Sequence, residues 1–349
     1  MLKSADRPTP ERFLVISTTA IGDTLMGTPA LRALRRSFPE SRIDVLVSSR
    51  RKELLRGNPD VDRIIPYHNN RLYREFLAWR LRRRFYDRIL IFHANDDVLE
   101  LLRGLQYGEC LSRQNFSDPE RRIYRLEDLP PHSIQKRMAL VERAGGKNSA
   151  EYQYTLNISE AAGIWAQRCL SRWGVSAKDL LVGLQLGAND AFKCWPVEFF
   201  AEVARHLRSV HGAKIFVNAS RPEKPLVHRF LKLTGGQGVF FHVGGNLSRS
   251  AALIRACSLF ISPDTGPMHL AMGLEIPLIA LFGPTDPLDT GPLDNEMSLV
   301  IHKSPSCDPC RTRSCGDNFC MRQISVAEVC EAADRILRSR KKDWKGGSS

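Results

Sequence analysis

One short segment combines an acid, a glycine and a helix start, which is the combination that anion-binding turns use. Residues 262–269 read SPDTGPMH and follow directly on an apolar run. We expect Asp264 to be the N-cap of a helix, leaving backbone N–H groups of Thr265, Gly266 and Met268 available in its first turn. Such a helix N-terminus suits a diphosphate, although an ordinary capped helix has the same local sequence.

Two other loops follow apolar runs in the same half of the chain. Residues 282–287, FGPTDP, predict a second rigid turn beside the first. Residues 186–196, LGANDAFKCWP, place Lys193 just before a helix that begins near Pro196. Because loops after parallel strands meet at one sheet edge, the ammonium of Lys193 is expected near residues 264–268. A solvated surface lysine is the alternative.

An acid also follows the first apolar run of the chain. Residues 18–25 read TTAIGDTL, with a single glycine and no match to the Gly-rich dinucleotide or P-loop patterns. Asp23 could therefore cap the following helix or face a ligand as a general base. The residues leave both roles open.

These loops need a scaffold that brings strand ends together. Apolar runs alternate with amphipathic stretches throughout the chain, which predicts an α/β protein with two parallel sheets and a junction within residues 146–178. Helices are predicted over 24–37, over 197–210 and near 224–233. Another over 71–85 is predicted to point Leu72, Phe76, Trp79 and Phe85 inward and its arginines outward. The predicted strands are 13–17, 43–48, 88–92, 180–187, 214–219, 239–243, 259–262 and 277–282.

Composition narrows the class of protein. A chain of 349 residues with 43% hydrophobic and 26% charged residues is typical of a folded protein of two domains. No apolar run approaches the ~18–20 residues of a membrane span, and the N-terminus lacks the apolar core of a signal peptide. We therefore expect a cytoplasmic protein. Its net charge of +13 favours a partner rich in phosphate or carboxylate, and no nucleic-acid reader motif is present.

Four of the nine cysteines form a cluster near the C-terminus. Cys307, Cys310, Cys315 and Cys320 could bind zinc or iron, but the single thiols at 315 and 320 do not repeat the spacing of the first pair. Reduced thiols in a loop are favoured over a metal site, and a cytoplasmic location argues against a disulfide.

Taken together, three segments resemble the ADP-heptose:lipopolysaccharide heptosyltransferases of glycosyltransferase family 9. They are ISTTAIGDTLMGTPALRALR (16–35), LGANDAFKCWP (186–196) and SPDTGPMHLAMGLEIPLIALFGPTDP (262–287). The resemblance extends over nearly the whole chain and is weaker from 93 to 178. It implies a GT-B fold, in which two Rossmann-like domains face each other across a cleft. The expected domains are an acceptor-binding domain (1–165), a nucleotide-sugar-binding domain (178–322) and a C-terminal helix with a basic tail (323–349).

The resemblance also implies an activity and its residues. The expected enzyme is an inverting glycosyltransferase that moves heptose from ADP-heptose to the inner core of lipopolysaccharide, with no metal and no cofactor. Asp23 resembles the family's catalytic base. Donor binding is expected from Lys193 together with the signature residues Asp264, Thr265, Gly266 and His269. Family members often carry an acid near residues 246–250, where this chain has none.

The expected partners are a nucleotide-sugar donor, an anionic glycolipid acceptor and the anionic cytoplasmic face of the inner membrane, touched peripherally; nucleic acid is not expected. The alternative is the same fold and mechanism with a different nucleotide sugar and a different glycan or protein acceptor. A nicotinamide dehydrogenase, a nucleic-acid-binding protein and a non-enzymatic scaffold fit the loops less well. The sequence leaves open the acceptor, the linkage position, the donor's exact sugar and the oligomeric state.

Overall fold

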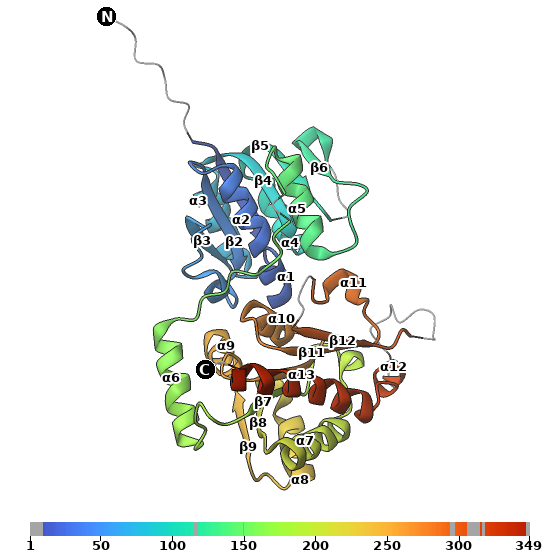
Figure 1. The fold of residues 1–349 in the computed structure, drawn as a ribbon. Coiled ribbons are helices and arrows are strands. Elements are labelled where there is room, and N and C mark those ends of the chain that lie inside the picture. The colour runs from blue at the N-terminus through green and yellow to red at the C-terminus, as the bar shows by residue number, and fades with distance from the viewer. Residues whose placement is uncertain are drawn as a thin grey trace, which may run out of the picture. The chain divides into compact units, whose positions relative to one another are not determined.

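The chain forms two α/β units, Met1–Asn157 and Ile158–Ser349, each built on a six-stranded parallel sheet (Figure 1). The structure is a computed structural model that describes residues 10–114, 118–148, 150–293, 297–305, 315 and 318–346. The division between the units falls within residues 146–178. Just before it, residues 150–157 return along the first unit, where the Thr155 amide donates to Thr28 Oγ1 at 2.9 Å.

The two sheets share one strand order. The first runs β3-β2-β1-β4-β5-β6 and the second β12-β11-β10-β7-β8-β9, which is the same order read from the other edge. This is the 3-2-1-4-5-6 order of Rossmann sheets, in which ligands bind where the order reverses, beyond the carboxyl ends of the central strands. Those central strands are β1 and β4 in the first unit and β7 and β10 in the second. The predicted α/β, GT-B architecture is confirmed.

The strands of the first sheet are β1 Arg12–Ser17, β2 Arg42–Ser48, β3 Arg63–Tyr67, β4 Phe85–His93, β5 Gln106–Ser112 and β6 Ile123–Arg125. Those of the second are β7 Leu181–Gln185, β8 Lys214–Ala219, β9 Val239–Val243, β10 Leu259–Pro263, β11 Leu278–Phe282 and β12 Ser298–His302. β7, β10 and β11 are buried along their whole length, as expected for central parallel strands with both faces covered.

Helices cover the sheets in each unit. In the first unit they are α1 Ile21–Met26, α2 Thr28–Ser37, α3 Arg71–Leu81, α4 Asp96–Leu102 and α5 Ser133–Arg143. In the second they are α6 Glu160–Arg172, α7 Val197–His211, α8 Lys224–Thr234, α9 Leu247–Ile254, α10 Gly266–Gly273, α11 Pro287–Thr290, α12 Phe319–Arg322 and α13 Val326–Gly346. α3 and α4 share a core with the first sheet, and α7, α8 and α13 share one with the second. None of the helices, as far as the structure describes them, combines the length and apolar character needed to cross a bilayer.

The predicted helix over 24–37 is two helices, α1 and α2, which meet at Gly27. A Cβ atom on Gly27 would lie 3.0 Å from the Phe92 ring, so a larger residue at this position would require the ring to shift. The strands β3, β5, β6 and β12 were not predicted. β3 contains Pro66 and β5 reads QYGECLS, so neither shows the apolar run that marks a buried strand.

The predicted orientation of residues 71–85 is wrong. α3 ends at Leu81 and buries Leu77 and Leu81, whereas Leu72 is 76% exposed. Its aromatic residues Phe76 and Trp79 are also exposed. The sequence carries two apolar stripes at helical spacing, and β1, β2, β3 and β4 leave room for only the aliphatic one.

Candidate functional site

Lys193 and Asp264 follow the two strands at the point where the order of the second sheet reverses. Lys193 lies in a short 3-10 turn after β7, and Asp264 directly follows β10. The Lys193 Nζ atom lies 2.7 Å from Asp264 Oδ2, and the side chains are 20% and 9% exposed. The predicted proximity of Lys193 to this edge is confirmed: the carboxylate positions an ammonium group that still reaches solvent.

Two residues far along the chain hold the Lys193 loop, Asn318 through its side chain and Ile324 through its backbone carbonyl. The Asn318 amide donates to the carbonyl oxygens of Ala191 and Cys194 at 2.8 and 3.3 Å. The buried Trp195 indole donates to the Ile324 carbonyl at 3.0 Å. Asn318 is separated from Ala191 by 127 positions, and its φ of 48° is a left-handed conformation that asparagine tolerates. No local pattern marks this residue, so the sequence analysis missed it.

The start of α10 differs in two details from the prediction. Thr265, not Asp264, is the N-cap, and the Met268 N–H donates to the Thr265 carbonyl at 3.1 Å. Asp264 lies one residue earlier, where its side chain pairs with Lys193 instead of capping the helix. Gly266 begins α10 and is half-buried, while His269 is buried at 4% exposure. β10 and β11 are parallel neighbours, so the turns after them lie side by side, and Thr290 of α11 donates to Asp264 Oδ1 at 3.4 Å.

Asp23 occupies the matching position in the first unit, in the helix that follows β1. Its Oδ2 atom accepts hydrogen bonds from Thr19 Oγ1 at 2.6 Å and from the Ala20 N–H, the N-cap amide of α1, at 3.2 Å. Its Oδ1 atom lies 2.9 Å from Nη2 of Arg137, an arginine in α5 with no solvent exposure. The carboxylate therefore caps the start of α1 and neutralises a buried charge, while its side chain remains 16% exposed.

The net electrostatic environment favours the ionised form of Asp23. Burial raises the pKa of this carboxyl, but the electrostatic interactions with Arg137 and His93 and the hydrogen bonds from Thr19 and Ala20 outweigh burial. The pKa consequently lies well below the usual range of an aspartate. His93 ends β4, the other central strand, so both strands at this reversal point supply groups to the site.

Comparison with known proteins decides the family. The model of glycosyltransferase family 9 (heptosyltransferase) matches residues 99–318, well over half of the chain and including Lys193 and Asp264. The chain belongs to glycosyltransferase family 9.

The resemblance stated from the sequence is thus confirmed, and the protein is a glycosyltransferase. It is 25% identical to lipooligosaccharide heptosyltransferase 2 of Campylobacter jejuni over 330 residues, 92% of this chain and 97% of that protein. Its fold matches that of a family 9 glycosyltransferase from Veillonella parvula at a TM-score of 0.83, with 23% identity over 96% of this chain and all of the other. The E. coli ADP-heptose lipopolysaccharide heptosyltransferase II matches at 0.75, with 22% identity over 95% and 99%.

This family 9 enzyme has a polar network beside the Lys193 loop that the sequence analysis missed. The Gln185 amide donates to Glu223 Oε1 at 2.9 Å and to the Gly187 carbonyl at 3.0 Å. Asn218 donates to Gln185 Oε1 at 2.9 Å, and the Ser220 N–H donates to the other Glu223 oxygen at 2.6 Å. A Cβ atom on Gly187 would collide with Glu223, which explains the glycine. The network supplies a carboxylate after β8, whereas residues 246–250 contain none.

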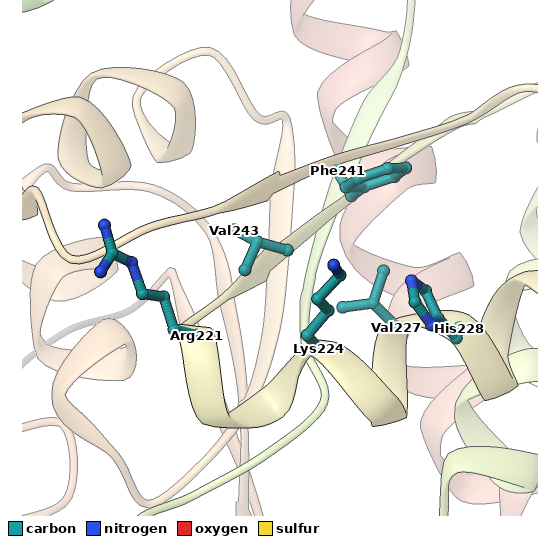
Figure 2. Close-up of a pocket in the computed structure, with 6 residues that line it drawn as sticks. All are labelled: Arg221, Lys224, Val227, His228, Phe241 and Val243. Atoms are coloured by element: carbon teal, nitrogen blue, oxygen red, sulfur yellow. The ribbon is translucent and has the colours of Figure 1, made fainter.

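A separate hollow of about 420 Å³ lies between α8 and β9 of the glycosyltransferase (Figure 2). Arg221, Lys224 and His228 line it together with Val227, Phe241 and Val243. None of the predicted donor-site residues contributes to this hollow, which lies at the edge strand and not at the point where the strand order reverses.

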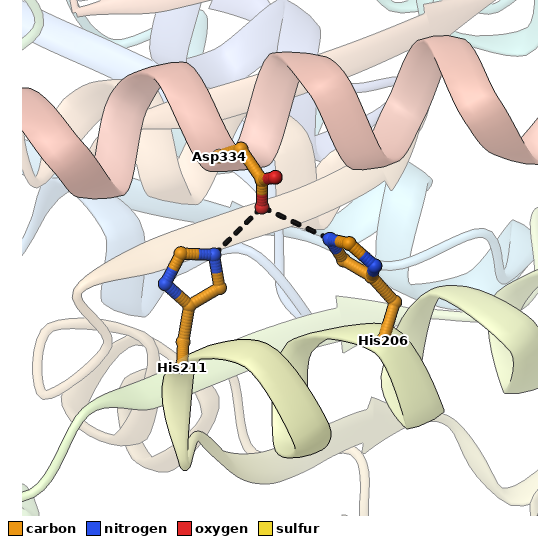
Figure 3. A group of neighbouring side chains, drawn as sticks. All are labelled: His206, His211 and Asp334. Atoms are coloured by element: carbon orange, nitrogen blue, oxygen red, sulfur yellow. Dashed lines mark hydrogen bonds and ion pairs between the residues drawn. The ribbon is translucent and has the colours of Figure 1, made fainter.

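One group of potential metal ligands joins two helices of the second unit (Figure 3). His206 and His211 of α7 each place Nε2 against Asp334 Oδ1 of α13, at 3.0 and 2.6 Å. Arg338 lies 3.4 Å from the other Asp334 oxygen. The carboxylate is therefore satisfied by its neighbours, and we interpret the group as a hydrogen-bonded link between α7 and α13.

The clustered cysteines fall partly outside the described residues, which include Cys315 and Cys320 but not Cys307 and Cys310. Cys320 is buried beside Met321 in the core of the second unit. The choice between a metal site, reduced thiols and a disulfide stays a prediction.

Proposed function

We propose that this glycosyltransferase moves a heptosyl group from ADP-heptose to the inner core of lipopolysaccharide. The relatives from Campylobacter jejuni and E. coli are a lipooligosaccharide and a lipopolysaccharide heptosyltransferase, matched over almost their full length, and the one from E. coli is an ADP-heptose enzyme. The observation that carries the proposal is the pairing of Lys193 with Asp264 beside the start of α10. It combines a cation and a helix N-terminus, the two features that bind a diphosphate.

In the proposed donor complex, Lys193 and the first turn of α10 bind the ADP diphosphate. Thr265 and Gly266 form that turn, and the small size of Gly266 leaves room for a phosphate group. Asp264 keeps the ammonium in place, and the buried His269 supports the turn from within α10. Glu223 offers carboxylate oxygens to the hydroxyl groups of the donor. As ADP departs, the preorganised positive potential stabilises its growing negative charge.

The proposed reaction is a direct displacement with inversion. The acceptor hydroxyl oxygen forms a bond to the anomeric carbon while the bond from that carbon to the ADP oxygen breaks, and Asp23 takes the hydroxyl proton. The low pKa of Asp23 makes it a weak base toward a resting alcohol. The proton becomes far more acidic once the carbon–oxygen bond has begun to form. We therefore infer that proton transfer to Asp23 occurs late in the displacement.

The proposed acceptor is supported by the net charge of the chain. An inner core substituted with phosphates and carboxylates is strongly anionic, and a chain with a net charge of +13 attracts it. Because this acceptor is carried by a lipid, we also propose that the enzyme contacts an anionic membrane peripherally, at the cytoplasmic face where the acceptor is made.

A donor and acceptor panel tests the proposal. Purified protein is incubated with ADP-heptose, UDP-glucose or GDP-mannose and with lipopolysaccharide truncated before its heptoses. We expect nucleotide release and a gain of one heptose in the acceptor mass with ADP-heptose alone. Transfer from UDP-glucose or GDP-mannose, with none from ADP-heptose, would refute the donor assignment and leave the glycosyltransferase class intact.

The low pKa of Asp23 leads to a prediction about how kcat/KM depends on pH. In the parent enzyme Asp23 stays ionised as pH falls, so kcat/KM should show no acid-side loss from this residue in the range where the protein is folded. Arg137→Gln removes the main cause that lowers the pKa and leaves the effect of burial, so we expect the pKa to rise by ~1–3 pH units. The base form, and with it kcat/KM, should then be lost at a higher pH.

The control for this pH profile is Arg143→Gln, which removes an exposed arginine from the last turn of the same helix. The pH dependence of the free energy of unfolding should also change in Arg137→Gln. A carboxylate with a lowered pKa contributes stability above its unfolded pKa and loses it as pH falls through the folded one, so Arg137→Gln should make this contribution smaller and complete its loss at a higher pH. An acid limb identical in the parent and in Arg137→Gln would remove Asp23 from the role of base.

A further inference from the structure

The outer side of α3 carries an apolar stripe with no partner in the described structure. Leu72, Phe76 and Trp79 stand at spacings of four and three residues, on the side of α3 opposite the buried Leu77 and Leu81. They are 76%, 50% and 40% exposed. Figure 1 shows α3 at the periphery of the first unit, beside β3. Three large exposed apolar side chains in register on one helix differ from the scattered ones of an ordinary surface.

The aromatic side chains of this stripe pack against one another. The rings of Phe76 and Trp79 stack with centroids 6.1 Å apart and planes at 28°. The Arg83 guanidinium carbon lies 3.9 Å from the Trp79 ring centroid, in a cation–π arrangement at the surface. Just beyond, Phe85 opens β4 with half of its surface exposed. These residues form a preformed apolar ridge, with the guanidinium group of Arg83 stacked on Trp79.

Basic side chains surround this ridge. Arg71, Arg80, Arg82 and Arg83 are exposed along α3 and the turn after it, and the acid among them, Glu75, is paired with Arg71 at 3.1 Å. Arg74 belongs to the inner side, where it lies 3.3 Å from Asp97. The ridge therefore presents apolar side chains within a net positive rim.

We propose that the outer face of α3, from Arg71 to Phe85, docks this enzyme on an anionic lipid bilayer. Trp, Phe and Leu enter the boundary between headgroups and acyl chains, while arginines contact lipid phosphates. A protein partner could bury the same ridge, but a rim with net positive charge is the complement of an anionic lipid surface. The proposal rests on the proposed function in one respect: docking would bring the enzyme to an acceptor that is carried by a lipid.

Binding of the full-length protein to acceptor-free vesicles tests this docking surface. Vesicles of phosphatidylcholine, alone or with phosphatidylglycerol, are sedimented with the protein in low and high salt. We expect binding to the vesicles that contain phosphatidylglycerol, weakened by salt. Phe76→Ser/Trp79→Ser should lower the partition coefficient at least tenfold. Arg80→Gln/Arg82→Gln should lower it by roughly fivefold per arginine.

Matched control variants distinguish binding through this surface from nonspecific binding to vesicles. Ile164→Ser/Val210→Ser removes two exposed apolar side chains from the second unit, and Arg172→Gln/Lys232→Gln removes two exposed charges there. Both should bind vesicles as the parent does. The Phe76→Ser/Trp79→Ser variant should keep its transfer rate on a delipidated, water-soluble acceptor. A failure of heptosyl transfer would thus leave the vesicle result standing.

Three outcomes would overturn the proposal. The first is a parent that does not bind anionic vesicles, and the second is equal binding by the α3 variants and the parent. The third is a parent that sediments as an oligomer and becomes a monomer in Phe76→Ser/Trp79→Ser, which would assign the ridge to a second copy of the chain.

Discussion

Replacing Asp23 by asparagine is expected to lower kcat by ~10²–10⁴-fold, the contribution of a positioned general base. The amide keeps the shape of the side chain and can still accept a hydrogen bond from Arg137, but it cannot take a proton. The measurement is ADP release under saturating donor and acceptor. Because donor binding is assigned to the other unit, the affinity for ADP should change by less than twofold.

The structure adds a stability cost to this variant, because Asp23 neutralises the fully buried Arg137. A buried charge that loses its carboxylate partner destabilises the fold, and with the amide still accepting a hydrogen bond we expect a loss of ~1–3 kcal/mol in the free energy of unfolding. Asp23→Asn/Arg137→Gln removes both charges and should recover part of that loss in urea denaturation. Its turnover should remain low.

The double variant therefore separates the two roles of Asp23. If turnover returns together with stability, the carboxylate matters only as the partner of Arg137 and the cap of α1, and the base lies elsewhere. If stability returns while turnover stays low, the catalytic role stands.

Replacing Lys193 by alanine should lower kcat/KM for the donor by ~10²–10³-fold, with a higher KM and a lower kcat. One ammonium contact serves both the bound diphosphate and the departing ADP, so both constants should change. Lys193→Arg keeps the charge but replaces a compact ammonium by a planar group, and we expect it to retain part of the activity. Lys232→Ala, an exposed lysine in α8 of the same unit, is the matched control.

A double-mutant cycle tests whether Asp264 acts through Lys193. The two groups are 2.7 Å apart, so their effects should not add. If Asp264 only positions the ammonium, Lys193→Ala/Asp264→Asn should be no slower than Lys193→Ala. A further loss in the double variant would show that Asp264 contacts the substrate itself, and unchanged kinetics in Lys193→Ala would place Lys193 outside the site.

The sequence alone determined the elements whose patterns are local. The buried strands β1, β7, β8, β10 and β11 are short apolar runs, and α7 and α8 have helical periodicity with clear ends, so each was predicted within a few residues. The loops after the central strands were also predictable. In a parallel sheet the carboxyl ends share an edge, and this rule was enough to place Lys193 near Asp264.

Tertiary structure decided everything that depends on distant neighbours. Arg137 follows Asp23 by 114 positions, and its one sequence signal is its place among the inward-facing Ile134, Met138 and Val141 of α5. The outward aromatic stripe of α3 is equally a matter of context, because both of its apolar stripes have helical periodicity and only the sheet selects the one to bury. Local patterns specify which segments become strands and helices. The faces that are buried and the charges that meet are set by packing between segments far apart in the chain, which no local pattern encodes.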